Sequence, residues 1–114
     1  VTGDYTPTIE VDLIREVAAA VDVQLVLHGG SGVPPDQIQA AIAAGIAKVN
    51  VGTRLKHVFG RGLQEALARD GGDPNLAYGS RLPGDVMACG ASALTDEVRR
   101  YIQIFGSAGK AGRR

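Results

Sequence analysis

The chain has 114 residues, which is enough for one modest hydrophobic core. Its 12 basic and 12 acidic residues cancel, so the composition carries no electrostatic footprint for nucleic acid. No apolar run approaches the roughly 20 residues that a membrane span needs, and we therefore expect neither nucleic acid nor a membrane as partner. The one cysteine, Cys89, excludes an internal disulfide and fits a reducing cytoplasm.

The first half of the chain alternates between helical and strand patterns. Apolar residues recur at helical spacing from Ile9 to Val21, with charged residues between them, which predicts an amphipathic helix. Residues 23–27 form a nearly continuous apolar run, typical of a parallel strand that is buried on both faces. After a glycine-rich turn, Pro34-Pro35-Asp36 begins a second helix, because proline is tolerated in the first helical turn.

The pattern then repeats. Residues 47–51 read as a second short strand, and a helix with an apolar stripe follows from about Thr53 to Arg69. Asp70-Gly71-Gly72 ends that helix. The order helix, strand, helix, strand, helix with short connections indicates parallel strands joined by right-handed crossovers, so the predicted fold class is α/β.

The last third of the chain has weaker patterns. Residues 70–93 are rich in Gly, Pro, Asn, Asp and Ser, and we expect them to form a long irregular loop, which at that length is usually functional or mobile. Residues 94–114 are expected to form a C-terminal helix and a small basic tail. We expect a single domain over residues 1–114.

Two strand ends carry residues suited to anion binding. The first is His28-Gly29-Gly30-Ser31-Gly32, where glycines let backbone N–H groups approach an anion and the serine adds a hydroxyl donor. The second is Asn50-Val51-Gly52-Thr53, which also leads from a strand into a helix. If the two strands are neighbours in one parallel sheet, both loops open at the same edge and their donors converge, as in the phosphate sites of eightfold barrels.

Each of these features also has a simpler interpretation. One glycine-rich turn alone is as often only a tight turn, and the pair of turns is what favours phosphate binding. A lone histidine such as His28 is more often a polar residue at a strand end than a ligand, but its place beside the anion loop favours a ligand role. His57 lies opposite the apolar stripe of its helix and is predicted to be exposed, and Cys89 has no base partner and receives no catalytic role.

These motifs resemble those of a known family. Residues 25–32, Leu-Val-Leu-His-Gly-Gly-Ser-Gly, resemble the strand-seven motif of class II (zinc-dependent) fructose- and tagatose-bisphosphate aldolases. Residues 48–53, Lys-Val-Asn-Val-Gly-Thr, are similar to the strand-eight motif, and residues 104–110 to the C-terminal end. The resemblance covers about residues 1–69 and 94–110. It implies the C-terminal part of a (β/α)₈ TIM barrel, strands seven and eight with their helices, and the first residue, Val1, fits a piece of a longer chain.

The resemblance also implies roles for particular residues. In the family the histidine of the first motif is a zinc ligand, which implies Zn²⁺ as cofactor and His28 as its ligand. The implied substrate-binding residues are Gly3, Gly29, Gly30, Ser31, Asn50, Val51, Gly52 and Thr53. The family's catalytic aspartate comes from an earlier strand, so no catalytic proton-transfer residue is expected in this chain.

One position departs from the family pattern. Another zinc histidine of the family lies upstream, in a motif of histidine, glycine, any residue and tyrosine. The best match here is Thr2-Gly3-Asp4-Tyr5, which puts a threonine where that ligand belongs. Because a catalytic zinc site usually has three protein ligands, a chain that offers only His28 should bind the metal weakly by itself.

The implied protein is an aldehyde-lyase, a class II aldolase. It would cleave fructose-1,6-bisphosphate or tagatose-1,6-bisphosphate reversibly into dihydroxyacetone phosphate and glyceraldehyde 3-phosphate, in the cytoplasm, as a homo-oligomer (dimer or tetramer) when full length. Its partner would be a phosphorylated sugar, held by the dihydroxyacetone phosphate moiety. Two alternatives stay open: a non-catalytic, metal-deficient homologue, for which Thr2 is the evidence, and another phosphosugar-binding TIM-barrel protein.

Overall fold

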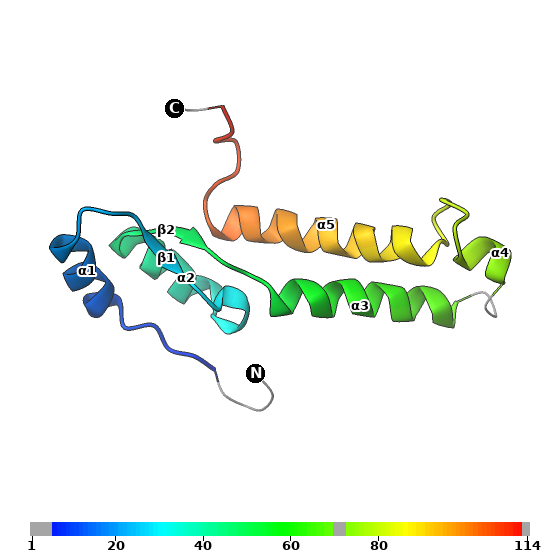
Figure 1. Cartoon of the computed structure of the whole chain (residues 1–114), viewed down its shortest axis with the longest axis horizontal. Helices are drawn as coiled ribbons and strands as arrows, with labels where there is room; N and C mark the ends of the chain where they lie inside the picture. The colour runs from blue at the N-terminus through cyan, green and yellow to red at the C-terminus, as the bar shows by residue number, and fades with distance from the viewer. Residues whose placement is uncertain (1–5, 70–72, 113–114) are drawn as a thin grey trace. The chain divides into compact units, whose positions relative to one another are not determined.

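The computed structural model of the chain describes residues 6–69 and 73–112 (Figure 1). The elements are α1 (Val11–Ala20), β1 (Leu25–Leu27), the 3₁₀ turn η1 (Gly30–Gly32), α2 (Pro35–Ala44), β2 (Ile46–Val49), α3 (Thr53–Ala68), α4 (Pro74–Ala77) and α5 (Val86–Ile104). The chain divides into two compact units. We call Val1–Gly52 with Ile102–Arg114 the strand unit, and Thr53–Tyr101 the helical unit.

The strand unit is built on a parallel pair of strands. β1 pairs with β2 so that Leu25 lies opposite Ile46 and Leu27 opposite Val49, with one irregularity after Leu25. The helix α2 connects the two strands, as a parallel crossover requires. The predicted α/β pattern with two neighbouring parallel strands is therefore confirmed.

The core of the strand unit is small. Its most buried apolar side chains are Ile38 and Ala41 of α2, at 1% and 0% exposure, and Ile46 of β2. α1 packs on α2, and α2 packs on β2. The Val26 side chain is 44% exposed, so the prediction that β1 is buried on both faces is wrong for the described chain. Successive strand residues point to opposite faces, and one layer of helices covers only one of them.

In the helical unit, α3 and α5 lie side by side (Figure 1). Two glycines allow this close approach. A Cβ atom on Gly62 would lie 3.0 Å from the Cys89 carbonyl oxygen and 3.1 Å from the Gly90 Cα. A Cβ atom on Gly90 would lie 2.8 Å from the ring of Phe59. A side chain at either position would therefore push the two helices apart.

The end of the helical unit differs from the expected loop over residues 70–93. The short helix α4 occupies residues 74–77, and α5 begins at Val86, eight residues before the expected start at Leu94. Ala77 and Val86 are buried together with Ala66 of α3. This apolar contact explains the difference, because it gives a segment rich in turn residues a core to fold against.

A buried carboxylate begins α5. Asp85 is only 4% exposed, and its carboxylate accepts hydrogen bonds from the backbone N–H groups of Met87 at 2.9 Å, Ala88 at 3.3 Å and Arg81 at 3.1 Å. These bonds, that of Arg81 foremost, hold the pKa of the Asp85 carboxyl below its usual value. Asp85 is therefore an N-cap that satisfies the first amides of the helix.

A second buried carboxylate, Glu97, lies farther along α5 at 8% exposure. Its Oε1 accepts hydrogen bonds from Arg100 and from Arg54 of α3, each at 2.8 Å. The bond from Arg100 is the main cause that lowers the pKa of Glu97 from 4.5 to about 2, and the bond from Arg54 adds to it. Arg100 also stacks over the ring of the buried Tyr101, with its guanidinium carbon 5.0 Å from the ring centroid.

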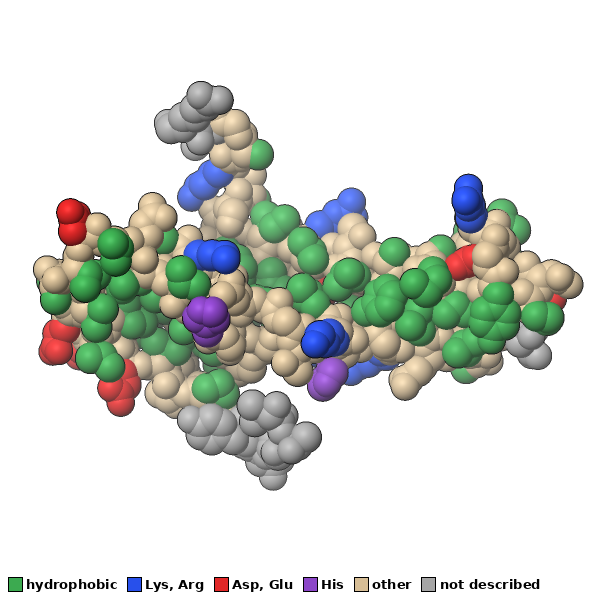
Figure 2. Space-filling view, in the orientation of Figure 1, with side chains coloured by type: hydrophobic (Ala, Val, Ile, Leu, Met, Phe, Trp, Pro, Cys, Tyr) green, Lys and Arg blue, Asp and Glu red, His purple; other side chains and the backbone are tan. Residues whose placement is uncertain are grey.

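Apolar side chains remain on the surface of the helical unit. Figure 2 shows them gathered on the visible face of α3, α4 and α5. Tyr78, Leu82 and Met87 are each more than half exposed, at 64%, 56% and 61%. Among the described residues, no helix combines the length and the apolar character needed to cross a membrane.

The close contact of α3 and α5 generates a test with a matched pair of glycines. Gly62→Ala should destabilise the protein by about 1–3 kcal/mol, because its Cβ meets backbone atoms that cannot yield. Gly60→Ala, two residues earlier on the same helix, meets nothing within 4 Å and should stabilise it by about 0.5–1 kcal/mol. Denaturant unfolding of both variants checks this, and equal effects would contradict the packing described.

The low pKa of Glu97 predicts acid-sensitive stability. The folded-state value of about 2 lies below the ordinary 4.5, so the stabilisation is fully present above pH 4.5 and is lost as the pH falls toward 2. At neutral pH, Glu97→Gln should cost about 1–3 kcal/mol, and this difference should shrink across that window. Unfolding free energies of parent and variant between pH 6 and pH 2 measure it. A difference independent of pH would contradict the ion pairing.

Candidate functional site

The site begins where the paired strands end. The Asn50 N–H, just after β2, donates to the Leu27 carbonyl oxygen at 2.9 Å, and the Asn50 carbonyl accepts from the Gly30 N–H at 3.0 Å. The hydrogen bonds of the strand pair thus continue into the two loops. They place the segment that follows β1 directly against the segment that follows β2.

Glycine is required twice in the first loop. Gly29 has a φ of +71°, in the left-handed region that side chains rarely adopt. Gly30 is buried, and a Cβ atom there would lie 2.6 Å from Val49 Cγ1 and 3.3 Å from the Asn50 carbonyl oxygen. The same Cβ would lie 3.6 Å from a methyl group of Val51. The loop can approach β2 this closely only because position 30 has no side chain.

His28 and Asn50 meet at this edge. The exposed His28 ring has its Nδ1 atom 3.2 Å from Nδ2 of the Asn50 side chain. With the amide nitrogen facing the ring, Nδ1 accepts and the ring proton sits on Nε2. With the amide turned over, Nδ1–H donates to the amide oxygen and the lone pair of Nε2 becomes available. In either arrangement Asn50 orients the imidazole ring.

Ser31 and Gly52 link the two loops a second time. The Gly52 N–H donates to Ser31 Oγ at 3.3 Å. Thr53 follows directly as the first residue of α3, where the N–H groups of the first turn have no partner within the helix. The hydroxyl and backbone donors of this region are of the kind that bind phosphate oxygens.

The structure thus brings five of the expected residues together at one edge of the strand unit: His28, Gly30, Ser31, Asn50 and Gly52. Gly29 supplies the turn that leads into them, and Val51 packs beside Gly30. Gly3 and Thr2 lie outside the described residues. Within residues 6–69 and 73–112, no group of three or more His, Cys, Asp or Glu side chains is placed to hold a metal ion.

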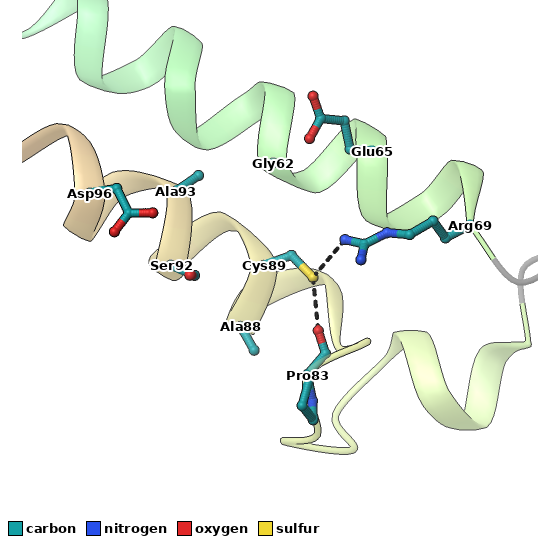
Figure 3. A pocket seen from close by; sticks show the side chains of 9 residues that line it. All are labelled: Gly62, Glu65, Arg69, Pro83, Ala88, Cys89, Ser92, Ala93 and Asp96. Carbon is teal, nitrogen blue, oxygen red and sulfur yellow. Dashed lines mark hydrogen bonds between the residues drawn. The ribbon is translucent and has the colours of Figure 1, made fainter.

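Within the helical unit, a cavity of about 390 Å³ lies between α3 and α5 (Figure 3). Cys89 lies in its wall, where the thiol donates to the Pro83 carbonyl oxygen at 3.0 Å and accepts from the Arg69 guanidinium at 3.3 Å. These bonds link α5 to the residue that follows α3 and to the turn before α5. The structure therefore gives the Cys89 thiol a packing and linking role.

Sequence reasoning missed the ion pair between Arg54 and Glu97. The two residues are 43 positions apart, so no local pattern could reveal the contact. The only sequence feature that pointed to this ion pair was Arg54 itself, an arginine directly after the second loop. The buried Asp85, by contrast, had a readable signal, because Pro83-Gly84-Asp85 is a typical start of a helix.

The chain matches the protein family described as class II fructose-bisphosphate aldolase over residues 1–110. A sulfofructosephosphate aldolase from Alkalicoccus urumqiensis is 35% identical over 105 residues, which cover 92% of this chain and 34% of that protein. A fructose-bisphosphate aldolase from Streptococcus pneumoniae is 37% identical over 107 residues, which cover 90% of this chain and 36% of that protein.

Solved structures show the same relationship. The crystal structure of the YdjI aldolase from Escherichia coli K12 matches with a TM-score of 0.76 at 30% identity, over 92% of this chain and 36% of that one. A fructose-bisphosphate aldolase from Campylobacter jejuni matches with a TM-score of 0.70 over 93% of this chain and 37% of that one. Its identity is 17%, so this second likeness shows the fold alone. The chain spans about a third of the length of the relatives that it matches.

The junction of the two loops generates a test. Gly30→Ala should destabilise the protein by about 1–3 kcal/mol, because its Cβ collides with β2 and breaks the bond to Asn50. Gly52→Ala is the matched control in the other loop, where a Cβ meets nothing within 4 Å, and it should change stability little. Thermal unfolding of the two variants checks the difference. A Gly30→Ala protein as stable as Gly52→Ala would show that the loops do not pack as described.

Proposed function

The chain belongs to the class II fructose-bisphosphate aldolase family, and on that premise we propose that the protein containing it cleaves a ketose bisphosphate by a reversible aldol reaction. Fructose-1,6-bisphosphate or tagatose-1,6-bisphosphate would yield dihydroxyacetone phosphate and glyceraldehyde 3-phosphate. The observation that carries the proposal is the junction at the two strand ends, where His28 contacts Asn50 and Ser31 contacts Gly52.

In this proposal β1 and β2 are strands seven and eight of a (β/α)₈ barrel, and the chain is the C-terminal part of that barrel. Parallel pairing with a helical crossover supports this placement, as does the match to about a third of an aldolase structure. In such barrels the loops at the carboxyl ends of the strands form the active site, often with a phosphate held after strands seven and eight. Both loops of this chain lie at that edge.

The substrate phosphate would be held by donors from both loops. Ser31 contributes its hydroxyl, and Gly29 and Gly52 contribute backbone that an anion can approach without a side chain in the way. Gly30, whose N–H is bonded to Asn50, would set the path of the loop around the phosphate. Thr53 adds the amides at the start of α3, which have no carbonyl partner within the helix. Asn50 and Val51, between these donors, would orient the dihydroxyacetone phosphate half, and Gly3 would add a contact from outside the described residues.

The described residues fit one ligand position of a zinc site, not a complete one. His28 is exposed at the strand end and its ring is oriented by Asn50, as is usual for metal-bound histidines. A catalytic zinc usually has three protein ligands, so the others would come from elsewhere in the protein. When bound, zinc supplies Lewis-acid polarisation of the ketone carbonyl. We assign no proton-transfer residue to this chain.

Thr2 favours a second candidate function. If it stands where the family has a zinc histidine, the protein would be a metal-deficient homologue that binds a phosphosugar without cleaving it. The zinc content of the full-length protein discriminates between the two. For the enzyme we also propose a cytoplasmic location and a homo-oligomer, either dimer or tetramer.

The roles of His28 and Ser31 predict different losses in the full-length protein. His28→Ala should lower bound zinc at least about tenfold and remove nearly all cleavage activity, because it deletes a ligand. Ser31→Ala should retain zinc and weaken substrate binding by about 1–3 kcal/mol, because it deletes one donor among several. Zinc content and steady-state kinetics measure both effects, with fructose-, tagatose- and sulfofructose phosphates as substrates.

The matched control is His57→Ala, which removes the other histidine of the chain, an exposed residue of α3. It should change neither metal content nor activity. A His28→Ala protein that keeps both its zinc and its activity would rule out the zinc-aldolase proposal. A parent without zinc or cleavage activity that still binds phosphosugars would favour the metal-deficient homologue.

A further inference from the structure

The Glu97 carboxylate has one partner on its own helix, α5, and one on α3. Its two oxygens accept from Arg100, at 2.8 Å and 3.2 Å, three residues farther along α5. The third hydrogen bond comes from Arg54 Nε at 2.8 Å. Arg54 is the second residue of α3, so this bond joins the first turn of α3 to α5 within the helical unit.

The burial of Glu97 distinguishes this pair from ordinary surface ion pairs. The Glu97 side chain is 9% exposed, whereas Asp96 and Arg99, which pair at 3.8 Å on the same helix, are 76% and 74% exposed. An exposed pair of that kind contributes little to stability. A buried carboxylate must keep its partners, because an unpaired charge in the interior is costly. The contact with Arg54 therefore restricts where the first turn of α3 can lie.

The first turn of a helix is the part that most needs such restraint. Its N–H groups have no carbonyl partner within the helix, and the turn frays unless something else holds it. Thr53 lies in that turn, next to Arg54, and its backbone N–H is among the donors assigned to the substrate phosphate in the proposed function. Donors bind an anion well only when they are already in position.

We propose that Glu97 is a positioning residue, which holds the first turn of α3 through Arg54 so that Thr53 is set for the substrate phosphate. This inference rests on the proposed function. It assigns a role in substrate binding to a side chain that touches no substrate atom, on a helix far along the chain from both loops.

Two other accounts of Glu97 predict different results. If the residue only stabilises the fold, its removal lowers the melting temperature and leaves the kinetic constants of the folded protein unchanged. If it only neutralises Arg54, its removal leaves a positive charge next to Thr53, and phosphate should then bind more tightly. Only the positioning account predicts that removal of Glu97 weakens phosphate binding, in spite of the added positive charge.

The test uses Glu97→Gln in the full-length protein, with Asp96→Asn as the matched control. The control removes the same charge one residue earlier, from a carboxylate that is exposed. Glu97→Gln should raise KM for the ketose bisphosphate and the inhibition constant of inorganic phosphate by about tenfold, with kcat within about twofold of the parent. Asp96→Asn should change none of these constants. Unchanged or tighter phosphate inhibition in Glu97→Gln would overturn the inference.

A double-mutant cycle tests whether Glu97 acts through Arg54. Arg54→Gln should also raise KM. The KM of the double variant should not exceed that of the single variant with the higher KM. Additive losses would overturn the inference, because they would mean that the two side chains act independently. If Glu97→Gln does not fold, Glu97→Asp takes its place. That variant keeps the charge and shortens its reach, and it must raise KM for the inference to stand.

Amide hydrogen exchange separates this inference from the proposed function. In α3 the amides of His57 and Val58 donate to the carbonyls of residues 53 and 54, so their exchange reports on the first turn. Exchange at these two amides should be faster in Glu97→Gln than in Asp96→Asn. A parent without aldol cleavage would refute the proposed function, while exchange and the directly titrated affinity for inorganic phosphate would still decide on Glu97. Equal exchange in the two variants would refute the role of Glu97 whatever the activity.

Discussion

Asn50 joins the two halves of the candidate site, because both of its backbone groups bond to the segment around β1. Its N–H donates to Leu27 at the end of β1, and its carbonyl accepts from Gly30 in the loop beyond. These two bonds extend the parallel pairing past the strands themselves. They require close backbone approach, and the missing side chain at position 30 permits it. The contacts of Asn50 with His28, and of Gly52 with Ser31, follow from that pairing.

The helical unit depends on a different interaction, the burial of two carboxylates that each accept several hydrogen bonds. Asp85 accepts backbone N–H groups and begins α5, and Glu97 accepts two arginines and ties α5 to α3. In both cases the hydrogen bonds compensate for the loss of water around the charge. Gly62 and Gly90 let the two helices lie close together, so that Arg54 of α3 can reach Glu97 of α5. The packing and the ion pair thus support each other.

The site at the strand ends is well formed but incomplete, and this agrees with the extent of the family match. The chain spans about a third of the aldolases that it resembles. Its described residues offer a serine hydroxyl bonded to the second loop and one oriented imidazole, without a cluster that could hold a metal ion by itself. The exposed apolar side chains, such as Val26 on β1 and Tyr78 after α4, show that some faces of the chain have no cover within the described residues.

The sequence alone determined the features that depend on neighbouring residues. Alternating helical and strand patterns indicated two parallel strands, and glycines directly after a strand indicated the tight loop at residues 28–32. The start of α5 was also encoded locally, in the N-cap signal of Asp85, although the turn residues around it masked that signal. Short-range backbone preferences leave a readable mark because the residues that express them are adjacent.

The tertiary structure decided what depends on residues far apart. Ser31 and Gly52, and Arg54 and Glu97, are separated by 21 and 43 positions, and only the folded chain shows which of the many possible partners each one meets. The burial of Val26 likewise depended on which elements cover β1, and a single layer of helices left that side chain exposed. A pattern in one segment records the preference of that segment, whereas a long-range contact is a property of two segments brought together by the packing of all the others.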